Sequence, residues 1–158
     1  MLEIKKFKDP ILRKKCLEVK LTDEVRSLIN EMKETMYAAN GVGLAAPQIG
    51  RSERIAVIDI GEGFLALVNP KIIKKEGSAI FEEGCLSFPG IFRKIKRAKK
   101  VKVTALNEEG ENIEIETSGF LACCLQHEID HLDGIIFLDR LSQLDKIKDK
   151  FKKCLKKY

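Results

Sequence analysis

The sequence lacks any long apolar run. No stretch approaches the roughly 20 consecutive apolar residues that a membrane-spanning helix needs, so no membrane partner is expected. The opening residues MLEIKKFKDP also lack the run of about 7–15 apolar residues typical of a secretory signal peptide. No repeat, low-complexity tract or linker divides the chain. These absences predict a single domain over residues 1–158, located in the cytoplasm or a compartment like it.

Cysteines are few and irregularly spaced, which argues against a secreted disulfide scaffold. A scaffold of that kind would usually show an even and denser set. The five cysteines are therefore expected to be reduced thiols, of which at least one is available to bind metal: Cys16, Cys85, Cys123, Cys124 and Cys154. The net charge of +5 permits contact with a polyanion but does not indicate specific DNA binding.

The order of apolar patterns predicts an α+β fold. Helical spacing predicts a helix over residues 21–40, capped by Thr22 or Asp23. The following ten residues, 41–50, are too rich in glycine for a regular helix or strand. A second helix begins after Ser118 and ends at Gly134, with apolar residues all round it, so it should be buried. A third, amphipathic helix covers residues 141–157, and the short apolar or alternating runs predict strands over 54–60, 64–69, 72–81, 100–106, 112–117 and 135–138.

The second helix carries the only two histidines of the chain, in the sequence His127-Glu-Ile-Asp-His131. A spacing of four residues stacks both rings on one helical face, where two imidazole nitrogens can reach one metal ion. Glu128 lies about 100° round the helix from His127, near the metal without being obliged to bind it. This placement suits a general base for water activated by the metal. The pattern alone is equally compatible with a pair of hydrogen-bonded structural histidines.

A catalytic metal site needs a third protein ligand and an open position. No histidine or glutamate follows His131, so the usual downstream ligand of an HExxH protease is missing. Upstream, Cys85 follows Gly84 in a loop between predicted strands, where a thiolate would complete a Cys-His-His site. A lone cysteine is more often a small buried hydrophobic residue, but the flanking Gly84, Ser87, Pro89 and Gly90 favour a shaped loop.

At this point three segments of the chain resemble the peptide deformylase family. They are Gly41-Val-Gly-Leu-Ala-Ala-Pro-Gln48, Glu83-Gly-Cys-Leu-Ser87 and Gln126-His-Glu-Ile-Asp-His131, in the family's order. The likeness runs from Asp9 to about Ser142. It implies antiparallel β-sheets packed around a buried central helix that carries HExxH, with an N-terminal helix and a C-terminal amphipathic helix. It also implies an enzyme that removes the formyl group from the N-terminal formyl-methionine of nascent peptides.

The resemblance assigns roles to individual residues. Cys85, His127 and His131 would hold the metal, and Glu128 would move a proton from water to the departing amine. The Gln48 side chain and the Leu86 backbone N–H would stabilise the oxyanion on the formyl oxygen, a role in which preorganised donors typically contribute about 3–4 kcal/mol each. Arg97 and Asp130 would form a supporting ion pair. The substrate would be bound by Val42, Gly43, Phe81, Glu83, Gly84, Phe120, Cys123 and Cys124.

Two features beyond these motifs bear on substrate and partners. Phe92 stands where some relatives carry an arginine that helps to hold the peptide backbone, and Arg93 is the available substitute. The C-terminal helix is amphipathic and basic, which is typical of a solvated face but also suits contact with ribosomal RNA. Its lysines are Lys146, Lys148, Lys150, Lys152, Lys153, Lys156 and Lys157.

The metal and the reaction class have alternatives. The resemblance implies Fe²⁺, although a thiolate with two imidazoles also suits Zn²⁺, and Ni²⁺ or Co²⁺ are possible in purified protein. The competing functions are an HExxH zinc endopeptidase, a non-catalytic metal-binding module in which Glu128 is structural, and a deformylase relative that has lost activity. The missing downstream ligand argues against the endopeptidase. A non-catalytic metal module would need a closed site of four ligands, but only three are visible. The three intact motifs argue against a relative that has lost activity.

Overall fold

The computed structural model describes residues 2–155, and the side chains of residues 2–149. Its α-helices are α1 (Asp23–Ala38), α2 (Gly119–Leu132) and α3 (Gln143–Leu155), and its short 3-10 helices are η1 (Pro10–Arg13), η2 (Ala46–Ile49) and η3 (Phe137–Arg140). Its strands are β1 (Gly43–Ala45), β2 (Ile55–Ile58), β3 (Leu65–Glu76), β4 (Ala79–Cys85), β5 (Phe88–Arg97), β6 (Lys100–Leu106) and β7 (Asn112–Ser118). No described helix is long and apolar enough to cross a membrane.

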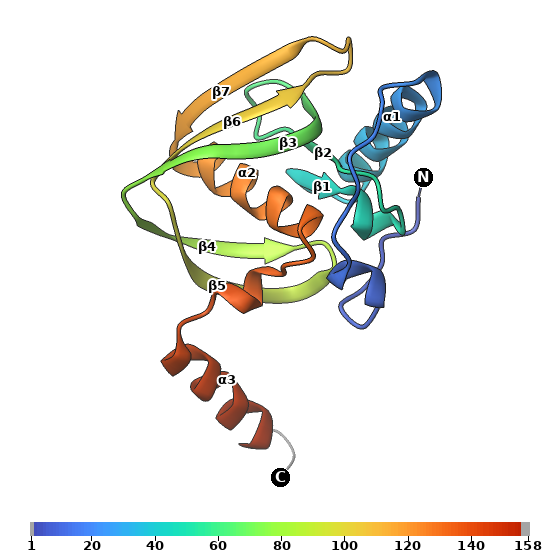
Figure 1. Ribbon diagram of the computed structural model, residues 1–158. Coiled ribbons are helices and arrows are strands. Elements are labelled where there is room, and N and C mark those ends of the chain that lie inside the picture. Colours follow the sequence, from blue (N-terminus) through green and yellow to red (C-terminus); the bar gives the residue numbers. More distant parts are fainter. Residues whose placement is uncertain (1, 156–158) are drawn as a thin grey trace.

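Two antiparallel sheets enclose α2, and the predicted α+β fold is confirmed (Figure 1). The larger sheet has the strand order β1-β2-β3-β6-β7, and β4 and β5 form a separate hairpin. In Figure 1, α2 runs between the larger sheet above and the β4-β5 hairpin below. This arrangement places the end of β4 opposite the second half of α2.

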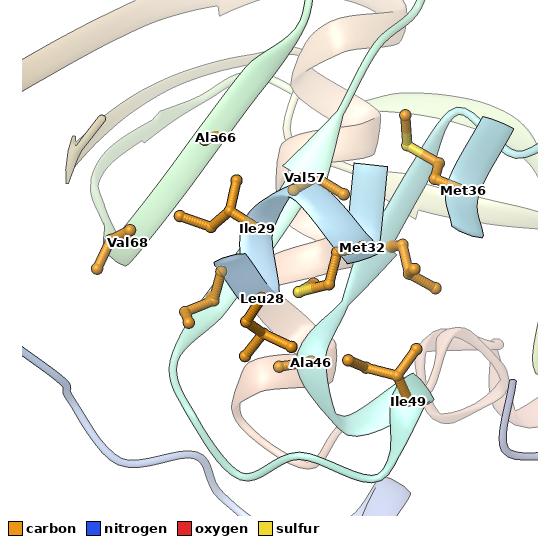
Figure 2. Packing of buried hydrophobic residues seen from close by; sticks show 11 residues of the cluster. Leu28, Ile29, Met32, Met36, Ala46, Ile49, Val57, Ala66 and Val68 are labelled. Carbon is orange, nitrogen blue, oxygen red and sulfur yellow. The ribbon is translucent and has the colours of Figure 1, made fainter. Parts of the chain in front are cut away.

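The β1-β2 end of the larger sheet is covered on both faces, which explains why β2 is buried along its whole length. Successive side chains of a strand point to opposite faces. Val57 packs with Met32 and other residues of α1, whereas Ile58 packs with Leu125 and Ile129 of α2. Figure 2 shows the α1 side of this core, where apolar residues of the helix meet those of β2 and β3. Burial on both sides fixes β1 and β2 against α2.

The first helix follows its sequence signals closely. Thr22 caps α1 by accepting a hydrogen bond from the Val25 backbone N–H at 3.4 Å. Asn40 follows the helix with a positive φ of 53°, a conformation that asparagine tolerates better than most residues. The predicted cap and stop therefore both lie at the ends of the helix.

Several expected boundaries were wrong, because glycine and proline interrupt the local pattern without ending the structure. The loop expected over residues 41–50 contains β1 and η2, and β5 was not predicted because Pro89 and Gly90 resemble a turn. The two strands expected over residues 64–69 and 72–81 are instead β3 and β4, and the break between these strands falls at Gly77. β3 passes through Pro70 at a register shift between Val68 and Lys71, where the missing N–H is tolerated.

The strand expected over residues 135–138 is also wrong. Residues 137–140 form η3, and the Asp139 carboxylate accepts a hydrogen bond from the Ile136 N–H at 3.0 Å. This contact closes a short helical turn that alternation of four residues cannot reveal. The turn directs Arg140 back toward α2.

Candidate active site

Cys85, His127 and His131 converge in the interior. Cys85 ends β4, and the two histidines lie one turn apart on α2. Their potential ligand atoms all lie within 4.8 Å of one another, and Cys85 Sγ is 3.3 Å from His131 Nε2. Both histidines are buried, whereas Cys85 is partly exposed. One thiolate and two imidazoles with an accessible side match the three-ligand sites of catalytic zinc and iron proteins.

The electrostatics of the triad fit a divalent cation. Burial opposes charge on either ring, but hydrogen bonds to Cys85 and Glu83 raise the pKa of His127 to about 10. Burial and the neighbouring His127 lower the pKa of His131 well below its ordinary value. Without a metal, His127 is therefore the ring that carries a proton and a positive charge, and His131 is neutral. A divalent cation would take the place of this proton, because metal binding requires neutral imidazoles and a thiolate.

Glu83 orients His127 from behind. Its carboxylate accepts a hydrogen bond from His127 Nδ1 at 2.8 Å and from Arg97 Nε at 2.7 Å. Burial alone would raise the pKa of Glu83, but Arg97 and His127 lower it to about 2. A charged carboxylate on Nδ1 leaves Nε2 of His127 available to the metal. This contact was not anticipated from the sequence, which placed Glu83 with the substrate. The only sequence signal for a role beside the metal was a charged residue two positions before Cys85 in a strand.

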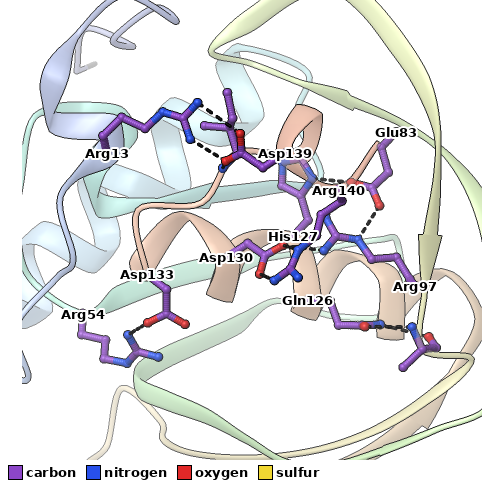
Figure 3. Close-up of polar contacts among 12 residues, drawn as sticks. Arg13, Arg54, Glu83, Arg97, Gln126, His127, Asp130, Asp133, Asp139 and Arg140 are labelled. Carbon is purple, nitrogen blue, oxygen red and sulfur yellow. Dashed lines mark hydrogen bonds and ion pairs between the residues drawn. The ribbon is translucent and has the colours of Figure 1, made fainter. Parts of the chain in front are cut away.

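Asp130 anchors the far side of the same network (Figure 3). Arg97 donates to Asp130, the partner that the resemblance implied. Arg140, which was not anticipated, also donates to Asp130, with Nη2 2.6 Å from Oδ1. Arg97 thus contacts both Glu83 and Asp130, and its side chain is only 3% exposed. The network joins β4, β5, α2 and η3 directly behind the triad.

Glu128 faces the triad without a partner of its own. Its Oε2 atom is buried and has no hydrogen-bond partner among the described residues. Burial raises the pKa of Glu128 to about 7, although the neighbouring His127 acts in the opposite direction. Gly43 of β1 lies directly against this carboxylate, since an added Cβ would overlap Glu128 Oε1. A carboxylate held in this way can accept or release a proton near neutral pH.

Gln48 is fixed beside the thiol. Its Oε1 accepts a hydrogen bond from the Ala45 N–H at 2.9 Å, which orients the amide. Its Nε2 then lies 3.4 Å from Cys85 Sγ and 3.2 Å from Ser87 Oγ. Leu86 lies in the two-residue connection between β4 and β5. The sequence-predicted donors, Gln48 Nε2 and the Leu86 backbone, are thus both next to the metal ligand Cys85.

A cleft of about 640 Å³ opens onto the triad, a volume typical of small-molecule sites. Phe81 does not line it: Phe81 lies two residues before Glu83 on β4, farther from Cys85. His131 is fully buried and does not line it either. The remaining residues that were expected to bind metal or substrate, or to take part in catalysis, all line the cleft: Val42, Gly43, Gln48, Glu83, Gly84, Cys85, Leu86, Phe120, Cys123, Cys124, His127 and Glu128.

The part of the cleft formed by Phe120, Cys123 and Cys124 is apolar and uncharged. Cys123 and Cys124 are almost fully buried. Burial raises the pKa of both thiols, that of Cys124 to about 12, so they remain neutral at physiological pH. Cys123 Sγ donates to Glu83 Oε1 at 3.3 Å. Neutral thiols beside Phe120 offer a polarisable surface of the kind that a methionine side chain packs against.

Comparison with known proteins agrees with this geometry. The family model described as polypeptide deformylase matches residues 1–147. The peptide deformylase of Desulfitobacterium hafniense is 56% identical over 131 residues, which cover 82% of this chain and 87% of that protein. That of Halothermothrix orenii is 52% identical and covers 91% and 96%.

Solved structures show the same relationship. The crystal structure of peptide deformylase from Thermotoga maritima superposes with a TM-score of 0.88 at 46% identity, covering 90% of this chain and 98% of that one. Sequence, fold and the Cys85/His127/His131 site thus agree along nearly the whole chain. The chain therefore belongs to the peptide deformylase family, the amidohydrolases that remove the N-formyl group from new polypeptides.

Proposed function

We propose that Cys85, His127 and His131 hold one divalent cation and that Glu128 carries the proton during hydrolysis of the formyl amide. The observation that supports this most strongly is a buried, unpartnered carboxylate oxygen of Glu128 beside the three converging ligand atoms. The cation would supply Lewis acidity, which lowers the pKa of a water molecule and polarises the formyl carbonyl.

Glu128 accepts the proton of the attacking water. The water oxygen forms a bond to the formyl carbon, and the bond between that carbon and the methionine nitrogen breaks. Glu128 then returns the proton to the departing amine, and formate leaves. A pKa near 7 suits both halves of this exchange, because general acid–base catalysis is most efficient when the pKa of the group lies near the working pH.

Gln48 Nε2 and the Leu86 N–H would stabilise the negative charge that develops on the formyl oxygen. The hydrogen bond from the Ala45 N–H to Gln48 Oε1 sets the amide so that Nε2 points toward the Cys85 side of the cleft. A donor positioned in advance needs no reorganisation as charge develops, and removing one typically lowers kcat by about 10²–10³.

The substrate is a formyl-Met nascent peptide, bound in extended form between two strand edges. Among the described residues, β1 pairs only with β2 and β4 only with β5, so each strand keeps one unpaired edge. Val42 and Gly43 line the cleft from the β1 side, and Glu83 and Gly84 line it from β4. An extended peptide can add to such edges by main-chain hydrogen bonds. The methionine side chain would then pack against Phe120, Cys123 and Cys124.

Iron is the metal we propose for the working enzyme. One thiolate and two imidazoles suit Fe²⁺ and Zn²⁺ alike, so the ligand set does not distinguish between these two ions. The resemblance to deformylases favours Fe²⁺. Metal analysis of protein purified without oxygen, paired with activity after reconstitution by Fe²⁺, Zn²⁺, Ni²⁺ or Co²⁺, distinguishes these ions. Higher turnover with Zn²⁺ than with Fe²⁺ would contradict the assignment.

The basic helix α3 would contact ribosomal RNA, and the cytoplasm is the expected location because nascent chains are made there. α3 projects away from the sheets (Figure 1). One ion pair joins it to the β4-β5 hairpin, between Arg93 Nε of β5 and Asp149 of α3 at 2.9 Å. Lys156 and Lys157 lie outside the described residues, as do the side chains of Lys150, Lys152 and Lys153. Salt-sensitive co-sedimentation with ribosomes tests the contact. Binding that survives deletion of residues 143–158 would exclude α3 as its source.

The proposed chemistry is tested by formate release from a formyl-Met tripeptide, using protein purified without oxygen. We expect release by the wild-type protein, a loss of about 10²–10⁴ in kcat for Glu128→Gln with metal still bound, and no release from the acetyl-Met peptide. Undiminished turnover by Glu128→Gln would exclude Glu128 as the proton carrier. Cleavage of internal bonds in an unformylated peptide would instead support an endopeptidase.

A further inference from the structure

Three exposed apolar side chains gather along the cleft. Phe92 is 60% exposed, Phe120 is 50% exposed and Val42 is 42% exposed. All three line the cleft that leads to Cys85. Scattered exposed apolar residues are ordinary, but several on the wall of one cleft indicate a surface that a ligand covers. Phe120 and Val42 lie near the proposed methionine pocket and the edge of β1, which leaves Phe92 without an assigned role.

The Phe92 ring lies against Gly84 on the neighbouring strand. A Cβ added to Gly84 would lie 2.6 Å from Phe92 Cε1, so only glycine leaves room for the ring there. Gly84 falls at the register shift of the hairpin, between the pairs Glu83–Arg93 and Cys85–Phe88. The ring therefore covers Gly84 on the exposed face of the hairpin, one residue before the metal ligand Cys85.

This position sets which part of the substrate the ring can meet. Consecutive Cα atoms are about 3.8 Å apart, and residues of an extended chain advance by about 3.3 Å. If the formyl-methionine amide is held beside Cys85, a ring over Gly84 reaches the next one or two residues along β4. Methionine itself is directed to the wall formed by Cys123 and Cys124, on the buried side of the cleft.

The charges at the rim do not select a charged residue. The exposed charged side chains there are Lys6 and Glu82, which have opposite signs. Lys6 Nζ is already bonded to the Leu86 carbonyl oxygen at 3.1 Å. The Phe92 ring can therefore set a preference at the rim, because it gains contact area with apolar side chains, whereas a carboxylate would lose hydration against the negative face of the ring. A lysine can instead lie over such a ring, as Lys33 lies over Phe64.

We infer that Phe92 is a specificity-determining residue, whose ring favours nascent chains with an aliphatic or aromatic second or third residue over chains with an acidic one. The inference rests on the proposed function, because it assumes that formyl-methionine occupies the site beside Cys85. The ring gives the enzyme a preference among nascent chains that all begin with the same residue.

The test compares kcat/KM for formyl-Met-Leu-Ser, formyl-Met-Ala-Leu, formyl-Met-Lys-Ser and formyl-Met-Asp-Ser, each divided by the value for formyl-Met amide. The wild-type enzyme is expected to favour the leucine peptides over the aspartate peptide, with a smaller penalty for the lysine peptide. Phe92→Ala should reduce this preference by about threefold to tenfold, the range expected for loss of one aromatic contact. Phe92→Leu should retain part of it.

Ile80→Ala is the matched control, because Ile80 is 69% exposed on the same hairpin and does not line the cleft. It should keep the full preference. Equal kcat/KM for all four peptides in the wild-type enzyme, or an unchanged preference in Phe92→Ala, would overturn the role of Phe92. Failure to release formate even from formyl-Met amide would instead contradict the proposed function, so the two failures are distinguishable.

Discussion

Gly43 lies where any side chain would displace the proposed proton carrier. An added Cβ would overlap Glu128 Oε1, and the φ angle of Gly43 is not in the left-handed region, so alanine fits the backbone but not the site. Gly43→Ala should therefore lower kcat by about a hundredfold, the effect expected when a catalytic group shifts by about 1 Å. The melting temperature and metal content should change little. Wild-type kcat would show that the Glu128 carboxylate tolerates the shift.

The role of Glu83 in orienting His127 could not be predicted from the local sequence pattern. The residue is 44 positions from His127 in the chain, yet its carboxylate holds His127 Nδ1. Glu83→Gln keeps the shape of the side chain but removes the charge. Loss of such an outer partner typically weakens metal affinity about 10–100-fold. Competition with a graded series of chelators measures this, and wild-type affinity in Glu83→Gln would assign the carboxylate to fold stability alone.

At the scale of elements, Arg97 fastens the β4-β5 hairpin to α2. Its guanidinium contacts Glu83 and Asp130 in the interior, and removing one partner from a buried pair usually costs about 3–5 kcal/mol. Arg97→Ala should lower the free energy of unfolding by about this amount and loosen the metal. Arg140→Ala should cost less, because Arg140 is 39% exposed and Arg97 still pairs with Asp130. Urea unfolding compares the two; equal losses, or full metal content with wild-type stability in Arg97→Ala, would contradict this account.

The elements also show what sequence patterns can and cannot predict. Periodicity and caps located α1 and α2, and alternation located β6 at its observed ends. Four-residue spacing on α2 placed His127 and His131 on one helical face and made them candidate metal ligands, and the family resemblance favoured metal binding over a structural role. By contrast, β1 and β5 contain or adjoin glycine and proline, and they are strands because β2 and β4 pair with them. The contacts of Cys85 with His131, of Arg140 with Asp130 and of Glu83 with His127 depend on how distant elements pack, which local spacing does not encode. The family resemblance implied that Cys85 and His131 lie together. The contacts of Arg140 and Glu83 were predicted neither from the residue pattern nor from the resemblance.

At the scale of the whole molecule, buried thiols limit stability at high pH. Cys16 packs with Ala45, Ala56 and Leu132, and burial raises its pKa to about 11. The folded state therefore keeps this thiol protonated at a pH where the unfolded chain ionises it, so its contribution to stability is complete below about pH 8.5 and is lost as the pH rises toward 11. Cys16→Ala should show a shallower fall in melting temperature over this range. Parallel curves for the two proteins would contradict the assignment.

The account of the whole molecule depends on one cation in the Cys85/His127/His131 site. The most direct measurement is formate release by metal-free protein during stepwise anaerobic addition of Fe²⁺, with bound metal determined at each step. We predict that the rate rises in proportion to bound metal and levels off at about one ion per chain, the number that one three-ligand site can hold. Full activity without metal, or no formate release with one ion bound, would contradict the central claim.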